Sequence, residues 1–227
     1  MFSYYGRKSK VIKYYPHPVY DTIIEPFAGT AVYSLFNDNW KKNIILIDKY
    51  DVIIRIWKYL QSTTPNDILK LPDVNNGDEL IKINGFTTLL QEEKWLIGFS
   101  VNNGSGMPKN VAGSFNSWYR DKKRIANDLY KIKHWKIYCD SYDSIENIQA
   151  TWFIDPPYQY GGKYYKHNTI DYKKLSEWCK NRMGQIIVCE NSKANWLPFI
   201  VLKEMNGQLH KTTEVIYYKN ETYNISI

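Results

Sequence analysis

The sequence predicts an α/β protein built on a mostly parallel, doubly wound sheet. Two observations predict this class. Short apolar runs of strand length alternate with segments whose apolar residues recur at helical spacing, and the alternation occupies both the start and the end of the chain. Alternating strands and helices are typical of a parallel sheet that is covered by helices on both faces. The middle of the chain is polar and irregular and interrupts the alternation.

The first part of the chain predicts two buried strands, each followed by a helix. Thr22–Phe27 is the first strand and runs into a turn, and Asn43–Asp48 is the second and ends on a carboxylate. A short helix is expected between them, around residues 32–36. The helix after the second strand has apolar residues at helical spacing, namely Val52, Ile53, Ile56, Trp57 and Leu60.

The same alternation returns near the end of the chain. Strands are expected at 136–139, 151–154 and 185–189, with a helix at 171–182 between the last two. Residues 213–219 are expected to form a final β-segment. These elements complete the sheet that the first part of the chain begins.

An insertion of residues 61–134 divides this domain into two parts, 1–60 and 135–227. It begins with a polar stretch and continues with a mixed segment that is expected to be helical in part. Asn102–Asn110 is rich in turn residues and is expected to form an irregular loop. Trp118–Lys133 is expected to form an amphipathic helix with a basic face.

The composition is basic and rich in aromatic residues. The 227 residues include 30 Lys and Arg against 23 Asp and Glu, a net charge of +7, and aromatic residues make up 16%. Such a chain suits a polyanionic partner with flat faces, as nucleic acids are. Solubility and core packing account equally well for both features, so composition alone does not decide between them.

Several classes of protein are excluded. No apolar run approaches the roughly 20 residues of a membrane span, and no secretory leader is expected, so we expect a cytoplasmic protein with no membrane partner. The cysteines are too widely spaced for a disulfide framework or a metal site: Cys139, Cys179 and Cys189. The histidines are expected to be structural or solvated, and no metal is expected: His17, His134, His167 and His210.

The most informative motif is Asp155-Pro156-Pro157-Tyr158, which directly follows an apolar strand. Ligands of open parallel sheets bind beyond the carboxyl ends of strands, so Asp155 stands where a site is expected. The two prolines fix the backbone and remove two N–H donors, which leaves carbonyl groups in set directions. A carboxylate, a fixed carbonyl and an aromatic face together suit an amino group on a flat heterocycle. A rigid turn at a strand end is the alternative interpretation.

With this motif, further segments resemble the Dam-type (alpha-group) DNA adenine-N6 methyltransferases in content and in order. Residues 4–8, Tyr-Tyr-Gly-Arg-Lys, are similar to a Tyr-x-Gly-x-Lys element. Residues 25–31, Glu-Pro-Phe-Ala-Gly-Thr-Ala, are similar to Glu-Pro-Phe-x-Gly-x-Gly, with Ala31 in place of the second glycine. The insertion occupies the place of the family's target-recognition region. The resemblance implies a Rossmann-like methyltransferase fold that binds S-adenosylmethionine without a metal.

The resemblance also implies which residues hold the cofactor. Tyr4 and Lys8 would bind the methionine carboxylate, and Gly29 would let the backbone approach the methionine half. Asp48 would accept hydrogen bonds from the ribose hydroxyls, although a helix N-cap is an alternative role for it. The implied set is Tyr4, Lys8, Phe27, Gly29, Asp48, Asp140, Ser141, Tyr142 and Asp155.

For the reaction, the resemblance implies that Asp155 and the carbonyl of Pro156 accept the two hydrogens of adenine N6. Tyr158 would stack on an adenine that is flipped out of a DNA duplex. Basic and aromatic residues of the insertion's last helix and of the loop after the motif would contact DNA: Lys122, Lys123, Arg124, Tyr160 and Lys163. Solvated surfaces are the alternative interpretation of both segments.

Other functions stay open at this point. The same chemistry on RNA adenine or on cytosine N4 is one alternative, and Asp155 favours adenine over cytosine. A catalytically silent nucleic-acid-binding module on the same scaffold is another. Residues 100–116 lack the Asn-x-Pro-Phe-Gly-like element of relatives that read GATC, so no recognition sequence is implied. We expect a monomer that works in a bacterial, archaeal or virus-infected cell.

Overall fold

The computed structural model describes residues 1–6, 8–102, 105–206 and 211–220. Parts of three expectations lie outside the described residues: Arg7 of the N-terminal motif, residues 103–104 of the expected irregular loop, and His210. The side chain of Lys163, which was expected to contact DNA, also lies outside the described part of the structure.

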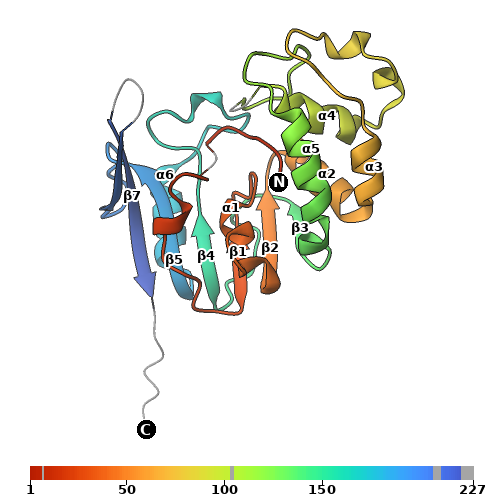
Figure 1. Cartoon of the computed structure of the whole chain (residues 1–227). Coiled ribbons are helices and arrows are strands. Elements are labelled where there is room, and N and C mark those ends of the chain that lie inside the picture. Colours follow the sequence, from red (N-terminus) through yellow and green to blue (C-terminus); the bar gives the residue numbers. More distant parts are fainter. Residues whose placement is uncertain (7, 103–104, 207–210, 221–227) are drawn as a thin grey trace.

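A seven-stranded sheet in the order β3-β2-β1-β4-β5-β7-β6 forms the centre of the molecule (Figure 1). The first five strands in this order are parallel, whereas β7 is antiparallel to both β5 and β6. The strand order reverses between β1 and β4, which creates a topological switch point there. The strands are β1 (Thr22–Glu25), β2 (Asn43–Asp48), β3 (Lys136–Cys139), β4 (Ala150–Ile154), β5 (Gly184–Asn191), β6 (Ile200–Asn206) and β7 (Lys211–Asn220).

Successive strand residues enter different cores, because side chains of a strand alternate between the two faces of a sheet. Ile23 belongs to one apolar core and Ile24 to the other, and Ile187 and Ile186 divide in the same way. Both faces are therefore covered, as expected for parallel strands. The helices are α1 (Val32–Leu35), α2 (Asp51–Ser62), α3 (Pro65–Lys70), α4 (Gln91–Ser100), α5 (Trp118–Asp128) and α6 (Tyr172–Lys180).

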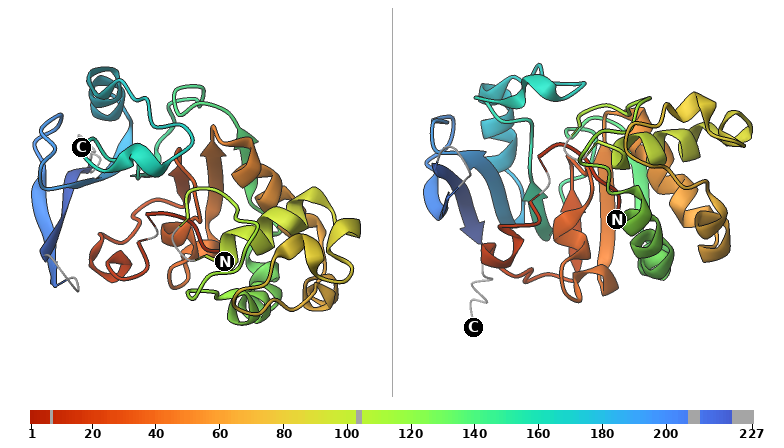
Figure 2. Two further views of the ribbon diagram at one scale, coloured as in Figure 1. Left: turned by 90° about the horizontal axis from the view of Figure 1, so that it is seen from above. Right: turned by 45° about the horizontal axis from the view of Figure 1, so that its top comes forward.

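The insertion shares a core with one face of the sheet. Leu96 of α4 and Trp118 of α5 are fully buried in the same cluster as Trp57 of α2 and Phe153 of β4. Helix α6 covers the other face, and Figure 2 shows it across the sheet from the insertion. The described residues of 61–134 thus extend the main core along α2, at the upper right of Figure 1.

Several elements differ from the sequence-based expectation, among them helix α3, which was not expected. Strand β6 was not expected, and the reason is physical: it is an edge strand with exposed Ile200 and Val201 and a register shift between Val201 and Lys203, so it lacks a clean alternation. The basic helix α5 ends at Asp128 and continues as a 3₁₀ turn over Leu129–Ile132.

Across the described residues, none of the helices has both the length and the apolar character that crossing a membrane requires. The same residues bring together no cluster of three His, Cys, Asp or Glu side chains suited to a metal ion.

Candidate active site

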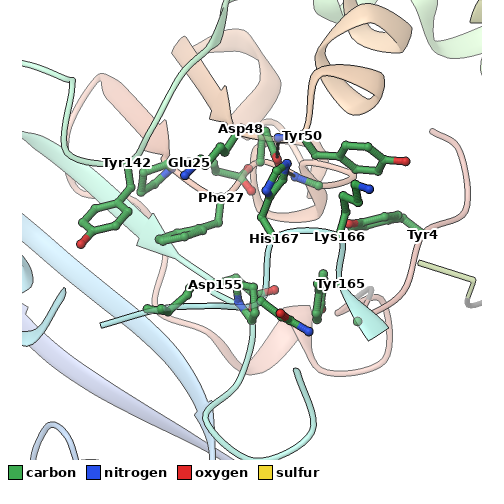
Figure 3. Close-up of a pocket in the computed structure, with 18 of the residues that line it drawn as sticks. Tyr4, Glu25, Phe27, Asp48, Tyr50, Tyr142, Asp155, Tyr165, Lys166 and His167 are labelled. Carbon is green, nitrogen blue, oxygen red and sulfur yellow. Dashed lines mark hydrogen bonds between the residues drawn. The ribbon is translucent and has the colours of Figure 1, made fainter. Parts of the chain in front are cut away.

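A cavity of about 390 Å³ opens at the carboxyl ends of β1 and β4, at the switch point of the sheet (Figure 3). Its walls come from segments far apart in the chain, because the parallel strands bring their carboxyl ends to one edge. The cavity has a carboxylate toward each end, Asp155 after β4 and Asp48 at the end of β2. The loop at 165–171 and the N-terminal segment complete its walls.

Asp155 is the polar centre of one end of the cavity. Lys8 reaches it from the N-terminal segment, with 2.9 Å between Lys8 Nζ and Asp155 Oδ1. Burial raises the pKa of the Asp155 carboxyl to about 6; the Lys8 ammonium lowers it, and the nearby Glu214 carboxylate raises it further. Around neutral pH this carboxyl is therefore mostly ionised and is an acceptor of N–H groups.

Glu214 of β7 lies behind Asp155 and anchors two tyrosines. Its Oε1 accepts the Tyr15 hydroxyl at 2.5 Å and the Tyr158 hydroxyl at 2.6 Å. Lys8 Nζ stands 4.4 Å from the centroid of the Tyr158 ring and 4.0 Å from Glu214 Oε1. These contacts hold the Tyr158 hydroxyl and place the Lys8 ammonium near the ring.

Asp48 organises the other end of the cavity. Its Oδ2 accepts the backbone N–H of Gly29 at 3.0 Å, and its Oδ1 accepts that of Tyr50 at 2.8 Å. Burial raises the pKa of the Asp48 carboxyl, while these two N–H groups act in the opposite direction. Each carboxylate oxygen has a second lone pair, so Asp48 ties the turn after β1 to the end of β2 and can still accept from a ligand.

Aromatic rings form the walls between the two carboxylates. Phe27 stacks on Tyr142 with ring centroids 5.3 Å apart and planes inclined by 25°. Tyr142 in turn packs its edge against Trp178 at 5.1 Å. Tyr50 and His167 meet at 6.1 Å near Asp48. Flat apolar walls beside a hydrogen-bonding carboxylate suit a planar heterocycle that carries a sugar.

The turn after β1 adopts a left-handed backbone. Gly29 has φ of 44°, and Ala31, the residue before α1, has φ of 47° and ψ of 46°. A methyl group is therefore accommodated at Ala31, but in the conformation that favours glycine. The residue that departs from the glycine-rich pattern thus has a left-handed backbone, and the Trp57 indole N–H donates to the Gly29 carbonyl at 2.9 Å.

Tyrosines of two segments close one side of the cavity. Tyr165 packs its edge against Tyr4 and Tyr5, with centroids 5.8 Å and 5.2 Å apart. This packing requires a glycine at position 6, because Gly6 has φ of 76° and a Cβ there would lie 1.9 Å from the Tyr165 hydroxyl oxygen. The glycine of the N-terminal motif therefore serves the fit between that segment and the loop after β4.

Glu25 lies inside the same cavity and was not expected as a site residue. It is 2% exposed, and its Oε1 accepts the backbone N–H of Ser34 at 2.8 Å. Burial raises its pKa to about 8, and the bonds from Ser34 lower it in part. Glu25 therefore links β1 to the start of α1 while adding little negative charge to the cavity at neutral pH.

The structure brings all but one of the expected cofactor residues together at the cavity. Asp140 does not line the cavity: it is exposed and its side chain accepts the backbone N–H of Ser141 at 2.7 Å. Asp143 lines the cavity instead. The expected residues that do line it are Tyr4, Lys8, Phe27, Gly29, Asp48, Ser141, Tyr142 and Asp155.

Hydrogen bonds from neighbouring elements anchor the Asp-Pro-Pro-Tyr segment and the residue after it. Pro156 is buried and is not among the residues that line the cavity, whereas Pro157 lines it and accepts the Tyr172 hydroxyl through its carbonyl at 2.7 Å. Tyr158 is half-buried beside the wall, held by Glu214. Beyond it, Glu190 of β5 accepts the backbone N–H of Gln159 at 2.9 Å, which fixes where the following loop begins.

The expected phosphate contact at Lys122 is corrected. Its ammonium is buried, donates to the Leu71 carbonyl at 3.0 Å and pairs with Asp73. The long side chain turns inward because a carbonyl and a carboxylate from the segment after α3 are there to satisfy it. Lys122 is thus a structural cation that ties α5 to that segment.

The two neighbouring basic residues differ from each other. Arg124 donates to the Met1 carbonyl at 2.7 Å and pairs with Asp121 at 2.5 Å, so its guanidinium is also engaged internally. Lys123 is exposed beside Tyr119, with 4.1 Å from its Nζ to the ring centroid. Tyr160, in the loop after β4, is exposed as expected.

Sequence reasoning missed several residues of the cavity wall. His167 was expected to be structural or solvated, yet it lines the cavity next to Lys166, and its charge would lower the pKa of Asp48. Glu214 was read as part of a purely architectural strand. One available signal was the place of Glu214 within residues 212–218, whose other members are apolar or carry a hydroxyl. For Lys166 and His167 the signal was their place in the loop after the Asp-Pro-Pro-Tyr motif.

Comparisons with known proteins add no assignment. No protein-family model and no curated protein matches the chain. A solved structure of a conserved hypothetical protein from Streptococcus pyogenes is similar over 88% of this chain and 86% of that one, with 12% sequence identity and a TM-score of 0.34.

Proposed function

We propose that this chain is an S-adenosylmethionine-dependent DNA adenine-N6 methyltransferase with a Rossmann-like methyltransferase fold. The observation that carries the proposal is one continuous cavity at the switch point of the sheet, with a nucleoside-type end around Asp48 and an amine-accepting end around Asp155. The resemblance of four ordered sequence segments to Dam-type enzymes supports the same conclusion independently.

The donor set fits S-adenosylmethionine. The cavity volume of about 390 Å³ lies within the range of small-molecule sites. Asp48 would accept from the ribose, and Phe27 and Tyr142 would flank the adenine. Tyr4 and the left-handed turn at Gly29 would border the methionine half. Because Lys8 is paired with Asp155, Lys166 is the better-placed cation for the methionine carboxylate.

When bound, S-adenosylmethionine supplies an electrophilic methyl group on a sulfonium. The protein's part is to place the acceptor amine. Asp155 and the Pro156 carbonyl would accept the two N6 hydrogens, which turns the nitrogen lone pair away from the ring and stabilises the charge that develops on it. The Tyr158 ring, fixed by Glu214, would stack against the adenine.

A flipped base is required because adenine N6 is out of reach inside a duplex. The net charge of +7 favours a polyanionic partner. The exposed aromatic residues Tyr160 and Tyr164 in the loop after β4 supply faces that suit unstacked bases. Lys123, in place of the three-residue cluster expected from the sequence, is the phosphate contact that we propose on α5.

The test is transfer of a labelled methyl group from S-adenosylmethionine to mixed-sequence duplex DNA, single-stranded DNA and RNA, followed by nucleoside analysis. We expect N6-methyladenine in duplex DNA. N6-methyladenine in RNA alone would move the proposal to RNA, and N4-methylcytosine would move it to the other base. Binding of S-adenosylmethionine without methylation of any nucleic acid would support the cofactor site and refute the proposed methyl acceptor.

A further inference from the structure

Lys8 stands where the proposed reaction requires the amino group of the target base. Its Nζ is 2.9 Å from Asp155 Oδ1 and 4.4 Å from the centroid of the Tyr158 ring. A carboxylate acceptor and an aromatic face are the same two contacts that the target adenine would use. The Lys8 ammonium and the base therefore compete, and the ammonium has to leave Asp155 Oδ1 when the base enters.

Glu214 provides the place to which the ammonium can go. Glu214 as a residue is 7% exposed, and Lys8 Nζ already lies 4.0 Å from its Oε1. A shift of roughly 1 Å would convert this contact into a normal charge-assisted hydrogen bond. Without Glu214, displacing Lys8 from Asp155 would leave a buried cation with the Gly6 carbonyl at 3.3 Å but with no counter-charge, which is strongly unfavourable.

We propose that Glu214 is a positioning residue that receives the Lys8 ammonium when the target base takes Asp155, while it holds the Tyr158 ring through the hydroxyl of that tyrosine. The inference rests on the proposed function, because it assumes an amino-bearing base at Asp155. Glu214 itself does not touch the base; it acts through Lys8 and Tyr158. Lys8 thereby fills and neutralises the empty site and remains paired while the site is occupied.

Two substitutions separate charge from anchoring. Glu214→Gln keeps an oxygen that can accept the Tyr15 and Tyr158 hydroxyls but removes the charge that would receive Lys8. We expect kcat for methyl transfer to fall at least tenfold, with the Kd for S-adenosylhomocysteine within twofold of wild type. The matched control Tyr15→Phe removes one hydroxyl from the same carboxylate and leaves Lys8 untouched, and its kcat is expected to stay within threefold.

The pH dependence of kcat/KM tests the charge of Glu214, because it would not change if Glu214 had only a structural role. The charge of Glu214 raises the pKa of Asp155, so its removal is expected to shift the acidic limb of kcat/KM to lower pH even as kcat falls. The other groups that act on Asp155 stay in place in this variant: Lys8, Tyr15, Glu25, Tyr158, Tyr165, Cys189 and Glu190.

The wild-type protein in the same assay separates this inference from the proposed function. If the wild type transfers no methyl group, the proposed function fails. If the wild type is active and Glu214→Gln keeps kcat within threefold with an unmoved acidic limb, Glu214 is only an anchor and the inference is overturned. If Glu214→Gln does not fold, Glu214→Asp is the variant to test, because it keeps the charge that would receive Lys8. A loss of kcat beyond tenfold in Glu214→Asp, with intact cofactor binding, would also overturn the inference.

Discussion

The sequence predicted functional residues both at the cavity beyond β1 and β4 and on the basic helix α5. The structure places the two sets of residues differently. Asp48 and Asp155 follow strands that are two places apart in the sheet, and both line the same cavity. On α5, adjacent Lys122 and Lys123 have opposite environments, one buried and ion-paired and the other exposed. A residue at the end of a parallel strand is positioned by topology, whereas a long side chain on a helix goes wherever its partners are.

The largest effect, a loss of kcat, is expected from Asp155→Ala in the cavity. Loss of the carboxylate removes the main acceptor of the target amine, so kcat is expected to fall about 10³-fold or more. The Kd for S-adenosylhomocysteine is expected to stay within tenfold, because Asp48 and the aromatic walls are unchanged. Single-turnover methylation and calorimetric titration measure the two quantities, and near-normal turnover in this variant would remove Asp155 from the mechanism.

The adjacent lysines of α5 give a matched pair of substitutions to Met. Lys122→Met is expected to lower the free energy of unfolding by about 2 kcal/mol, because the Leu71 carbonyl and Asp73 lose a charged donor. It should leave the salt dependence of DNA binding unchanged. Urea unfolding and binding titrations at several salt concentrations measure both quantities.

Lys123→Met is expected to do the reverse, with unchanged stability and a slope of log K against log salt that is flatter by about 1. The slope change should be the same for every DNA sequence, since phosphate contacts carry no sequence information. If Lys122→Met flattened the slope and Lys123→Met did not, the assignment of the two environments would be reversed.

The buried carboxyl of Glu25 in the cavity predicts that the stability of the protein depends on pH. The pKa of Glu25 is raised from 4.5 to about 8 by burial, so its contribution to stability is fully present below pH 4.5 and is lost as the pH rises through 8. Glu25→Gln should flatten the decline of the unfolding free energy between pH 5 and 9. Chemical denaturation at a series of pH values tests this, and an unaltered decline would show that another group causes it.

The smallest effect is expected from the glycine substitution of Ala31, in the turn after β1. Ala31→Gly should change the free energy of unfolding by less than about 1 kcal/mol, because the lost methyl contacts and the relieved left-handed strain offset each other. Ala31→Val should lower it by about 2 kcal/mol, since a β-branched residue tolerates a positive φ poorly. Thermal melting of the two variants side by side gives the comparison.

Strands and strand ends were predictable from the sequence because local apolar runs specify them. Asn43–Asp48 was predicted with its observed bounds, and the Asp155 motif followed its strand as expected. The edge strand β6 was not predictable from alternation, since its bulge breaks the pattern. Helix α3 was missed although its signal was present: Thr64 and Asp67 form a capping box, with Pro65 at the first helical position.

The candidate site was predictable where a motif follows a strand and not where partners meet across the fold. Nothing local shows that Lys8 turns to Asp155 or that Glu214 accepts two tyrosine hydroxyls, because these contacts join residues that are far apart in the chain. The same reasoning explains Lys122, whose burial depends on Asp73 in a distant loop. Long-range pairing, rather than residue type, decides these environments.

The most direct test of the account is a methylation assay in living cells. The wild-type chain and its Asp155→Ala variant would be expressed in a bacterial host that lacks adenine methylation, and genomic nucleosides would be quantified by mass spectrometry. The account predicts N6-methyladenine in the DNA of cells with the wild-type chain and none with the variant. Wild-type cells without N6-methyladenine, at equal expression of a folded protein that binds S-adenosylmethionine, would contradict it.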